Sequence, residues 1–239
     1  MIDKFDLFKI LFIDIETVPM TSSFEDLPGH FKPLWEKKAQ RIANPNNLGP
    51  EKLFDKAGIF SEFGKIVCIS AGFFRIEGEQ LTFRVKSFHG HHEKVLLDEF
   101  AALLNEHYNT DMHSLCAHNG REFDFPYLSR RMLVHEITLP TMLNNFGKKP
   151  WEVNLVDTMD MWRFGDYKSY TSLELLAAIF GIPTPKDDIS GADIHRVYWQ
   201  ENDLERIATY CSKDVVTIAR LFMKYCNLGV LEEENVFYF

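Results

Sequence analysis

An apolar segment that carries two acids constrains the fold of this chain most. Residues 8–16 read Phe-Lys-Ile-Leu-Phe-Ile-Asp-Ile-Glu, a short, β-branched run typical of a strand that is buried on both faces. Side chains alternate between the faces of a strand, so Asp14 and Glu16 lie on one face with Cα atoms roughly 7 Å apart. Two like charges in a central strand cost several kcal/mol unless something neutralises them. Either the strand ends at Ile13 and both acids are solvated, or the two carboxylates share a cation.

The remaining apolar patterns predict an α/β fold. Strands are expected over 66–74 and 81–88, joined by a turn at Gly78, and again over 113–118 and 153–158. Helical spacing is found over 92–108, about 125–135, 171–180 and about 203–226. Thr171 and Glu174 form a capping pair for the third helix, Gly181 closes it, and Asn202 is the expected N-cap of the last. We therefore expect a mixed five- to six-stranded sheet, an antiparallel meander plus parallel strands, flanked by helices.

The chain of 239 residues is expected to form a single domain, 1–239, with an insertion at about 17–62. The insertion holds five prolines and a short helical pattern around Leu34 to Ile42. A net charge of −9 argues against a protein that coats nucleic acid by charge alone. The cysteines form no C-x-x-C pair, and no apolar run of about 18 residues could span a bilayer. These features predict a cytoplasmic protein with no membrane partner.

Two later segments carry polar side chains that allow two interpretations each. Residues 116–126 run from a strand through Asn119 and Gly120 to a helix that starts near Asp124. Asp124 either caps that helix or supplies a carboxylate to a site. Tyr210 and Asp214 are spaced i and i+4 on the last helix, so they form either a surface pair or part of the same site.

Together the three segments offer four carboxylates and no converging set of His or Cys. Hard divalent cations such as Mg²⁺ prefer oxygen ligands of this kind. Two such ions about 3.5–4 Å apart stabilise both the attacking and the leaving oxygen of a phosphodiester. The residue types therefore fit metal-assisted phosphodiester hydrolysis better than a zinc hydrolase.

The same residues resemble a known superfamily. Residues 12–17, the Asn119 to Pro126 segment and Tyr210-x-x-x-Asp214 are similar to the three exonuclease motifs of the DEDD superfamily. The tyrosine spacing is that of the subclass found in proofreading domains of family B DNA polymerases. Residues 62–70, 172–183 and 186–194 resemble the stand-alone, predicted polymerase-B-like 3′-5′ exonucleases of bacteria. The resemblance implies a ribonuclease-H-like fold.

The resemblance also implies a role for each motif residue. Two Mg²⁺ or Mn²⁺ ions would be held by four carboxylates, those of Asp14, Glu16, Asp124 and Asp214. Tyr210 would orient the attacking water and complete the catalytic set. The terminal nucleotide would be held by Thr17, Asn119 and Phe123.

The function that the resemblance implies is a metal-dependent 3′-5′ exonuclease acting on the 3′ ends of single-stranded DNA and releasing nucleoside monophosphates. One alternative is an exoribonuclease with the same site. A second is a nucleic-acid-binding module without turnover. A third, a glycosidase with Asp14 and Glu16 as its acid/base pair, leaves the other motif residues without a role.

Several other side chains have a functional and a structural interpretation. Lys148–Lys149 and Arg130–Arg131 either contact phosphates or face solvent, and Lys37, Lys38 and Arg41 would belong to a lid formed by the insertion. Phe60, Phe63 and Phe125 either stack on a base or pack in the core. Asp157 and Asp160 either support the site or form a turn at a strand end.

Overall fold

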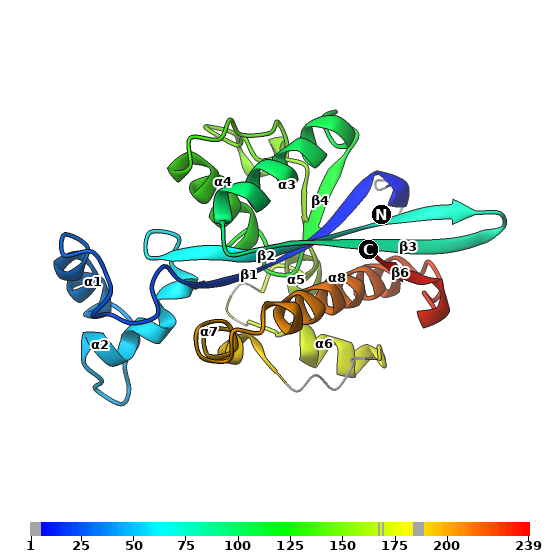
Figure 1. The fold of residues 1–239 in the computed structure, drawn as a ribbon. Helices are drawn as coiled ribbons and strands as arrows, with labels where there is room; N and C mark the ends of the chain where they lie inside the picture. Colours follow the sequence, from blue (N-terminus) through cyan, green and yellow to red (C-terminus); the bar gives the residue numbers. More distant parts are fainter. Residues whose placement is uncertain (1–5, 167, 169, 184–188) are drawn as a thin grey trace.

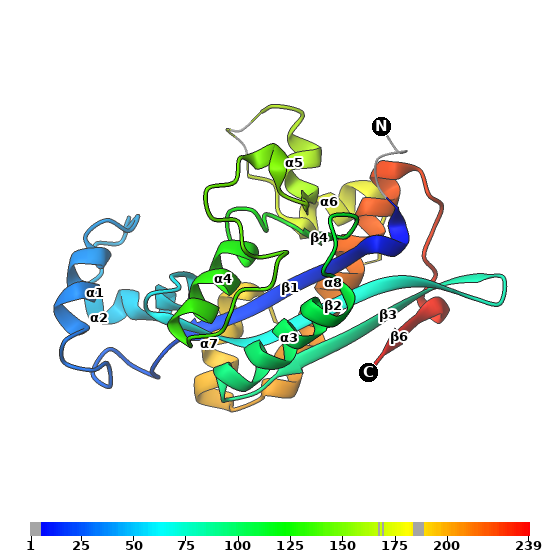
Figure 2. The same ribbon diagram turned by 90° about the horizontal axis from the view of Figure 1, so that it is seen from above.

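The computed structural model describes residues 6–166, 168, 170–183 and 189–239. Its centre is a six-stranded sheet with the order β5-β4-β1-β2-β3-β6 (Figures 1 and 2). The strands are β1 (Ile10–Pro19), β2 (Gly64–Glu77), β3 (Gln80–His89), β4 (Ser114–Ala117), β5 (Leu155–Asp157) and β6 (Val236–Tyr238). The first three form an antiparallel meander, whereas β4 and β5 are parallel additions beside β1 and β6 is parallel to β3. The mixed sheet predicted from the sequence is confirmed.

Helices cover both faces of this sheet (Figure 1). They are α1 (Lys32–Ala39), α2 (Pro50–Leu53), α3 (Glu93–His107), α4 (Asp124–Val134), α5 (Thr158–Arg163), α6 (Leu173–Phe180), α7 (Ile194–Arg196) and α8 (Leu204–Cys226). Leu11, Ile13 and Ile15 of β1 pack with α3 and α4 on one face. Phe12 packs on the other face, with its ring centroid 5.5 Å from that of Phe222 in α8. The central strand is therefore buried on both sides, which is why it is apolar at nearly every position.

Two predicted helix caps are wrong by one residue. The side chain of Ser172, not that of Thr171, accepts a hydrogen bond from the first turn of α6, at 3.2 Å from the Leu175 nitrogen. Asp203, not Asn202, caps α8 through the Arg206 nitrogen at 3.1 Å. Asn202 instead has a left-handed φ of 55° and closes the preceding π-helical turn. Gly181 ends α6 at φ 62°, as predicted.

Residues 20–63 form a lobe beyond the C-terminal end of β1 (Figures 1 and 2). The strand continues to Pro19, so this segment starts three residues later than the expected insertion. The lobe has its own core around the fully buried Trp35. The Tyr127 hydroxyl of α4 donates to the Gly58 carbonyl at 2.7 Å, which ties the lobe to the main body.

None of the helices in the described part of the chain has the length and apolar character needed to cross a membrane. Residues 186–188 of the third family-like segment lie outside the described residues. The rest of that segment leads into α7, where Ile189 and Ile194 pack in a buried cluster with Tyr198.

Candidate active site

Asp14 and Glu16 lie in the middle of the sheet and not in solvent. They pair with Ser70 and Cys68 of β2, and the register shifts between Glu16 and Thr17. Both side chains lie on the sheet face that α8 covers, since they alternate with Ile13 and Ile15, which pack under α3 and α4. Glu16 is only 8% exposed. The interpretation of a strand that ends at Ile13 is therefore wrong.

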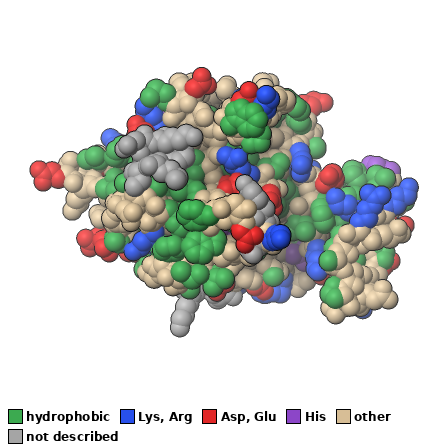
Figure 3. Space-filling model, turned by 180° about the vertical axis from the view of Figure 1, so that it is seen from behind, with side chains coloured by type: hydrophobic (Ala, Val, Ile, Leu, Met, Phe, Trp, Pro, Cys, Tyr) green, Lys and Arg blue, Asp and Glu red, His purple; other side chains and the backbone are tan. Residues whose placement is uncertain are grey.

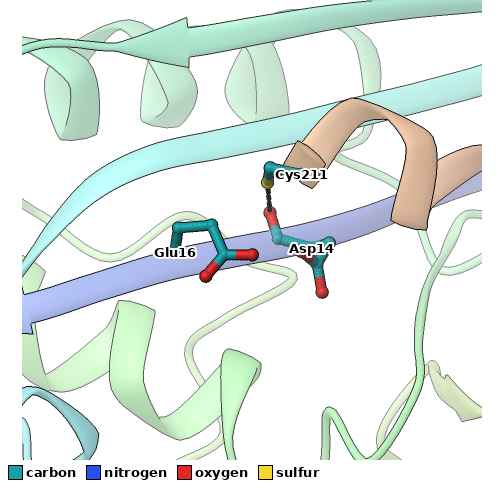
Figure 4. Close-up of side chains that lie close together, drawn as sticks. All are labelled: Asp14, Glu16 and Cys211. Carbon is teal, nitrogen blue, oxygen red and sulfur yellow. Dashed lines mark hydrogen bonds between the residues drawn. The ribbon is translucent and has the colours of Figure 1, made fainter. Parts of the chain in front are cut away.

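The two carboxylates point into the same space beside β1, next to Cys211 of α8 (Figure 4). One ligand atom of each of these three residues lies within 4.8 Å of the other two. The Cys211 thiol donates to the main-chain carbonyl of Asp14 at 3.4 Å, so it joins α8 to β1. The Asp14 Oδ2 atom is buried and has no hydrogen-bond partner among the described residues. A buried anionic oxygen without a partner is costly unless a proton or a cation compensates it.

Asp124 reaches β1 from the opposite layer. Strand β4 pairs with β1 only as far as Cys116 opposite Phe12, so the later N–H groups on this edge of β1 lack a strand partner. Asp124 Oδ1 accepts the Ile15 N–H at 3.2 Å and thereby replaces the missing strand. The residue is the first of α4, and no side-chain cap forms at that helix start. Its carboxylate therefore faces the acids of β1 and does not cap the helix.

Helix α8 supplies the remaining two motif residues. The Tyr210 hydroxyl donates to the Asp214 carboxylate one turn further along the same helix. Both side chains are half-buried, so they are not a surface pair. Asp214 contributes to raising the pKa values of Asp14, Glu16 and Asp124. The four carboxylates from β1, α4 and α8 therefore form one electrostatic cluster.

The pKa values of four residues in the cluster are raised, namely those of Asp14, Glu16, Asp124 and Tyr210. Burial is the largest cause of the raised pKa values of Asp14 and Glu16, and repulsion by the neighbouring carboxylates adds to it. Burial also raises the pKa of Asp124 to about 7, with Asp157 and Asp214 contributing in the same direction. The pKa of Tyr210 is raised by burial and then by Asp214, so the phenol is neutral at physiological pH.

Asp157 holds the loop that leads to Asp124. It is 3% exposed and accepts hydrogen bonds from the nitrogens of Asn119 and Arg121 at 2.9 and 3.0 Å. It also caps α5 through the Met159 nitrogen at 2.9 Å. The two interpretations of this residue are thus both correct, because one carboxylate supports the site and forms the strand-end turn. Asp160 lies on the rim, bound to Arg121 and Arg163.

The three predicted nucleotide-binding residues frame the acid cluster without belonging to it. Asn119 adopts a left-handed φ of 59° directly after β4, and its Oδ1 is buried with no hydrogen-bond partner among the described residues. Phe123 is half-buried, with its ring centroid 5.4 Å from that of Tyr127. Thr17 follows the register shift after Glu16, and its side chain hydrogen-bonds Tyr127.

Some of the other sequence candidates are structural. Phe63 and Phe125 are buried in the core and have no face free for a base. Arg131 is not a phosphate contact, because its guanidinium is buried against Glu93 with nitrogen–oxygen distances of 2.6 and 2.9 Å. Cys211 is a neighbour of the acids that the sequence analysis did not identify. Nothing in the sequence pattern indicates that its sulfur lies beside the two acids of β1.

The donor set fits a divalent cation. Asp14, Glu16, Asp124 and Asp214 offer oxygen ligands, and the unpartnered Oδ2 of Asp14 is the kind of atom that a bound cation would satisfy. No lysine or arginine of the described residues contributes to the pKa shifts of Asp14 and Glu16, so mutually repelling carboxylates dominate the cluster, as a site for positive charge requires.

Comparisons with known proteins bear on the family and the fold of this chain. A family model described as a predicted 3′-5′ exonuclease related to the exonuclease domain of PolB matches residues 59–236. The matched segment contains Asp124, Tyr210 and Asp214, whereas Asp14 and Glu16 precede it. No curated protein matches the chain.

Among solved structures, the chain is similar to the family B DNA polymerase from the hyperthermophilic archaeon Pyrobaculum calidifontis. The TM-score is 0.55 at 14% sequence identity, and the match covers 90% of this chain and 24% of the polymerase. The chain therefore spans about a quarter of that polymerase, and the likeness is one of fold. Because the family model covers well over half of the sequence, the chain belongs to the family of predicted 3′-5′ exonucleases related to the exonuclease domain of PolB.

Proposed function

We propose that this protein is a metal-dependent 3′-5′ exonuclease that hydrolyses phosphodiester bonds at the 3′ ends of single-stranded DNA and releases nucleoside monophosphates. The observation that carries the proposal is the convergence of four carboxylates and one neutral tyrosine from β1, α4 and α8. Family membership supports the direction of the reaction.

The four carboxylates would hold two divalent cations, Mg²⁺ or Mn²⁺. When bound, such ions polarise the scissile phosphate, lower the pKa of water and stabilise the leaving oxygen. The raised pKa values of Asp14, Glu16 and Asp124 mean that protons compete for this site in the absence of metal. Burial and mutual repulsion thus make the carboxylates depend on a cation for their charged state.

Tyr210 would position the attacking water through its hydroxyl. Because its pKa is raised, the phenol keeps its proton and acts through hydrogen bonds, not as a general base. The bond to Asp214 fixes the direction of the hydroxyl. Orientation of a nucleophile in this way lowers the barrier without a change in charge.

The terminal nucleotide would lie between β1 and the loop that Asp157 holds. Glu16 and the main chain at Thr17 would contact the 3′-hydroxyl end, and Asn119, whose buried Oδ1 has no hydrogen-bond partner among the described residues, would hold the terminal nucleotide. Phe123 presents a half-exposed ring for stacking on the terminal base.

The test is digestion of 3′-labelled DNA and RNA oligomers of one sequence, with Mg²⁺, with Mn²⁺ and in chelator. We expect labelled deoxynucleoside monophosphate from DNA, no product in chelator, and a block by a 3′-phosphate. Faster release from RNA would identify an exoribonuclease. Metal-dependent binding without any product would identify a binding module.

A further inference from the structure

A groove of about 640 Å³ runs along the outer side of α4. Its other wall is the segment 139–153, which connects α4 to β5. The floor is apolar and consists of Phe125, Leu133, Leu139, Leu143 and Val153. This volume is typical of a binding pocket, and the groove is separate from the acid cluster, to which it contributes no carboxylate.

The charge of the groove is opposite to that of the chain. Three of its lining residues are cations, Arg121, Arg130 and Lys148, and none of its lining residues is an acid. The whole chain has 35 acidic and 26 basic residues, so a lining with three cations and no acid is more basic than the chain as a whole. Arg130 and Lys148 are exposed and form no ion pair with a described acid. Arg121 is bound to Asp160 at 3.5 Å. The rim therefore attracts anions.

Two exposed aromatic rings flank two lysines in the segment 139–153; Phe146 and Lys148 line the groove, and Trp151 follows the lining residue Pro150. Phe146 is 74% exposed and Trp151 is 77% exposed, and Lys148 and Lys149 lie between them in the sequence. The Lys149 ammonium lies 5.3 Å from the centroid of the Trp151 ring. Neither ring is needed for the core, and an exposed tryptophan is unusual without a ligand or partner.

The groove and the candidate active site share helix α4 but lie on different sides of it. Helix α4 begins at Asp124, and the next residue, Phe125, lines the groove. Arg130 follows six residues after Asp124, which corresponds to about 9 Å along the helix axis. Pro126, Arg130 and Leu133 lie on the side of α4 that is turned away from Asp124. A strand whose 3′ end lies at the acids would therefore reach the groove by passing round the N-terminal end of α4, where Arg121 lines the groove.

We propose that the groove binds unpaired nucleotides of the single strand upstream of the 3′ end, an inference that rests on the proposed function. The rings of Phe146 and Trp151 offer flat faces for bases, and Arg130 and Lys148 offer charge for phosphates. An acidic peptide would use the same cations. It would not need two exposed rings interleaved with lysines, and so nucleic acid is the occupant that the groove fits.

The test combines binding and turnover in the full chain. The probe for binding is 5′-fluorescein dT12 with a phosphorothioate at the terminal linkage, measured by anisotropy in Mg²⁺. The variant Arg130→Glu with Lys148→Glu is expected to raise the Kd at least tenfold. It should also reduce the slope of log K against log salt by about 1.4, or 0.7 for each lost phosphate contact on a single strand. The kcat/KM for the dinucleotide dT2, which is too short to reach the groove, should stay within twofold of the parent.

A second variant separates stacking from charge. Phe146→Ala is expected to raise the Kd for dT12 at least about fivefold, the lower end of the effect of one stacked base, and to leave the salt slope unchanged. If the Kd of both variants equals that of the parent, the groove does not bind the strand and the inference is wrong.

The matched control is Lys52→Glu with Lys56→Glu. Both lysines are exposed on the lobe, where Lys and Arg side chains also gather (Figure 3), and the change in formal charge is the same. This variant should bind dT12 within twofold of the parent. An equal loss in the control would mean that net charge, not the groove, determines binding, and the inference would fail.

Three further outcomes are decisive. If a twelve-residue polyglutamate displaces dT12 as well as unlabelled dT12 does, the groove is a site for acidic segments and the inference is overturned. If dT12 binds through the groove but neither dT12 nor dT2 is hydrolysed, the groove assignment stands and the proposed function fails. If the parent hydrolyses both dT12 and dT2 and the groove variants bind dT12 as tightly as the parent, the proposed function stands and the groove inference fails.

Discussion

Asp14→Asn is expected to make the metal-free protein more stable while it abolishes catalysis. The carboxylates of Asp14 and Glu16 have oxygens within 4.8 Å of each other; Glu16 and the Oδ2 atom of Asp14 are buried. Two unit charges 4.8 Å apart repel by about 3.5 kcal/mol at an effective dielectric constant of about 20. The parent avoids part of this cost by binding a proton, so we expect asparagine to relieve about 1–3 kcal/mol at pH 8.

The gain should depend on pH with a definite sign. The folded pKa values of Asp14, Glu16 and Asp124 are raised, so the folded state binds protons more tightly than the unfolded state. Their contribution to stability is full below the unfolded pKa of about 4 and is lost as the pH rises through the folded values, about 7 for Asp124. Parent and variant should therefore melt together at pH 4 and below and diverge progressively as the pH rises from 4 through 7.

The assay is a set of melting curves in chelator and in excess Mn²⁺. For a chain of this size about 1–3 kcal/mol corresponds to a rise in Tm of roughly 2–12 °C at pH 8 in chelator. In Mn²⁺ the order should reverse, because an ion at 100 times its Kd stabilises the parent by about 2.7 kcal/mol and the variant loses most of that gain. Asp111→Asn, at an exposed acid, is the control and should move neither curve.

One result would refute this reasoning. If Asp14→Asn melts well below the parent in chelator and keeps the full Mn²⁺ shift, Asp14 is a structural residue of the strand. The acid cluster would then not be a metal centre.

Three other substitutions test separate parts of the account. Tyr210→Phe should lower kcat by about 10- to 1000-fold and leave the Mn²⁺ shift in Tm intact, because it removes the hydroxyl's bonds to the reacting water and to Asp214 but no carboxylate ligand. Loss of the shift would make Tyr210 structural. Asp157→Ala should lower the free energy of unfolding by about 2–4 kcal/mol in urea titration, because it removes the acceptor of several main-chain N–H groups, and a change below about 0.5 kcal/mol would contradict its role. Glu93→Ala should cost about 3–5 kcal/mol in the same assay, because Arg131 is left buried without its partner, whereas a neutral effect would mean that water compensates the guanidinium.

The helices and strands that could be predicted from the sequence are those with a regular spacing of apolar residues within the element itself. The alternation in β1 and the apolar stripe of α8 are local patterns, and both elements form where they are expected. Strand β6, by contrast, is three residues long and pairs with β3 through a contact that no local pattern encodes. A short edge strand of this kind depends on the rest of the fold, and so it was not predicted.

For the candidate site, spacing located the acids but not their partners. The interval between Tyr210 and Asp214 predicts that they share a helix face, and they do. That Asp124 accepts the Ile15 N–H follows from the early end of β4, which only the three-dimensional pairing shows. The burial of Arg131 has the same origin, since its sequence neighbour Arg130 is exposed and only the partner Glu93 in α3 distinguishes them.

Digestion of a circular and a linear single strand of the same sequence tests the central claim most directly. The linear strand has a 5′ and a 3′ end and the circle has neither, and the 5′ label on the linear strand reports the direction of shortening. Each substrate is incubated with the parent protein in Mn²⁺ and in chelator. The account predicts stepwise shortening of the 5′-labelled linear strand in Mn²⁺, an intact circle and no product in chelator. Cleavage of the circle at a comparable rate, or shortening that continues in chelator, would contradict it.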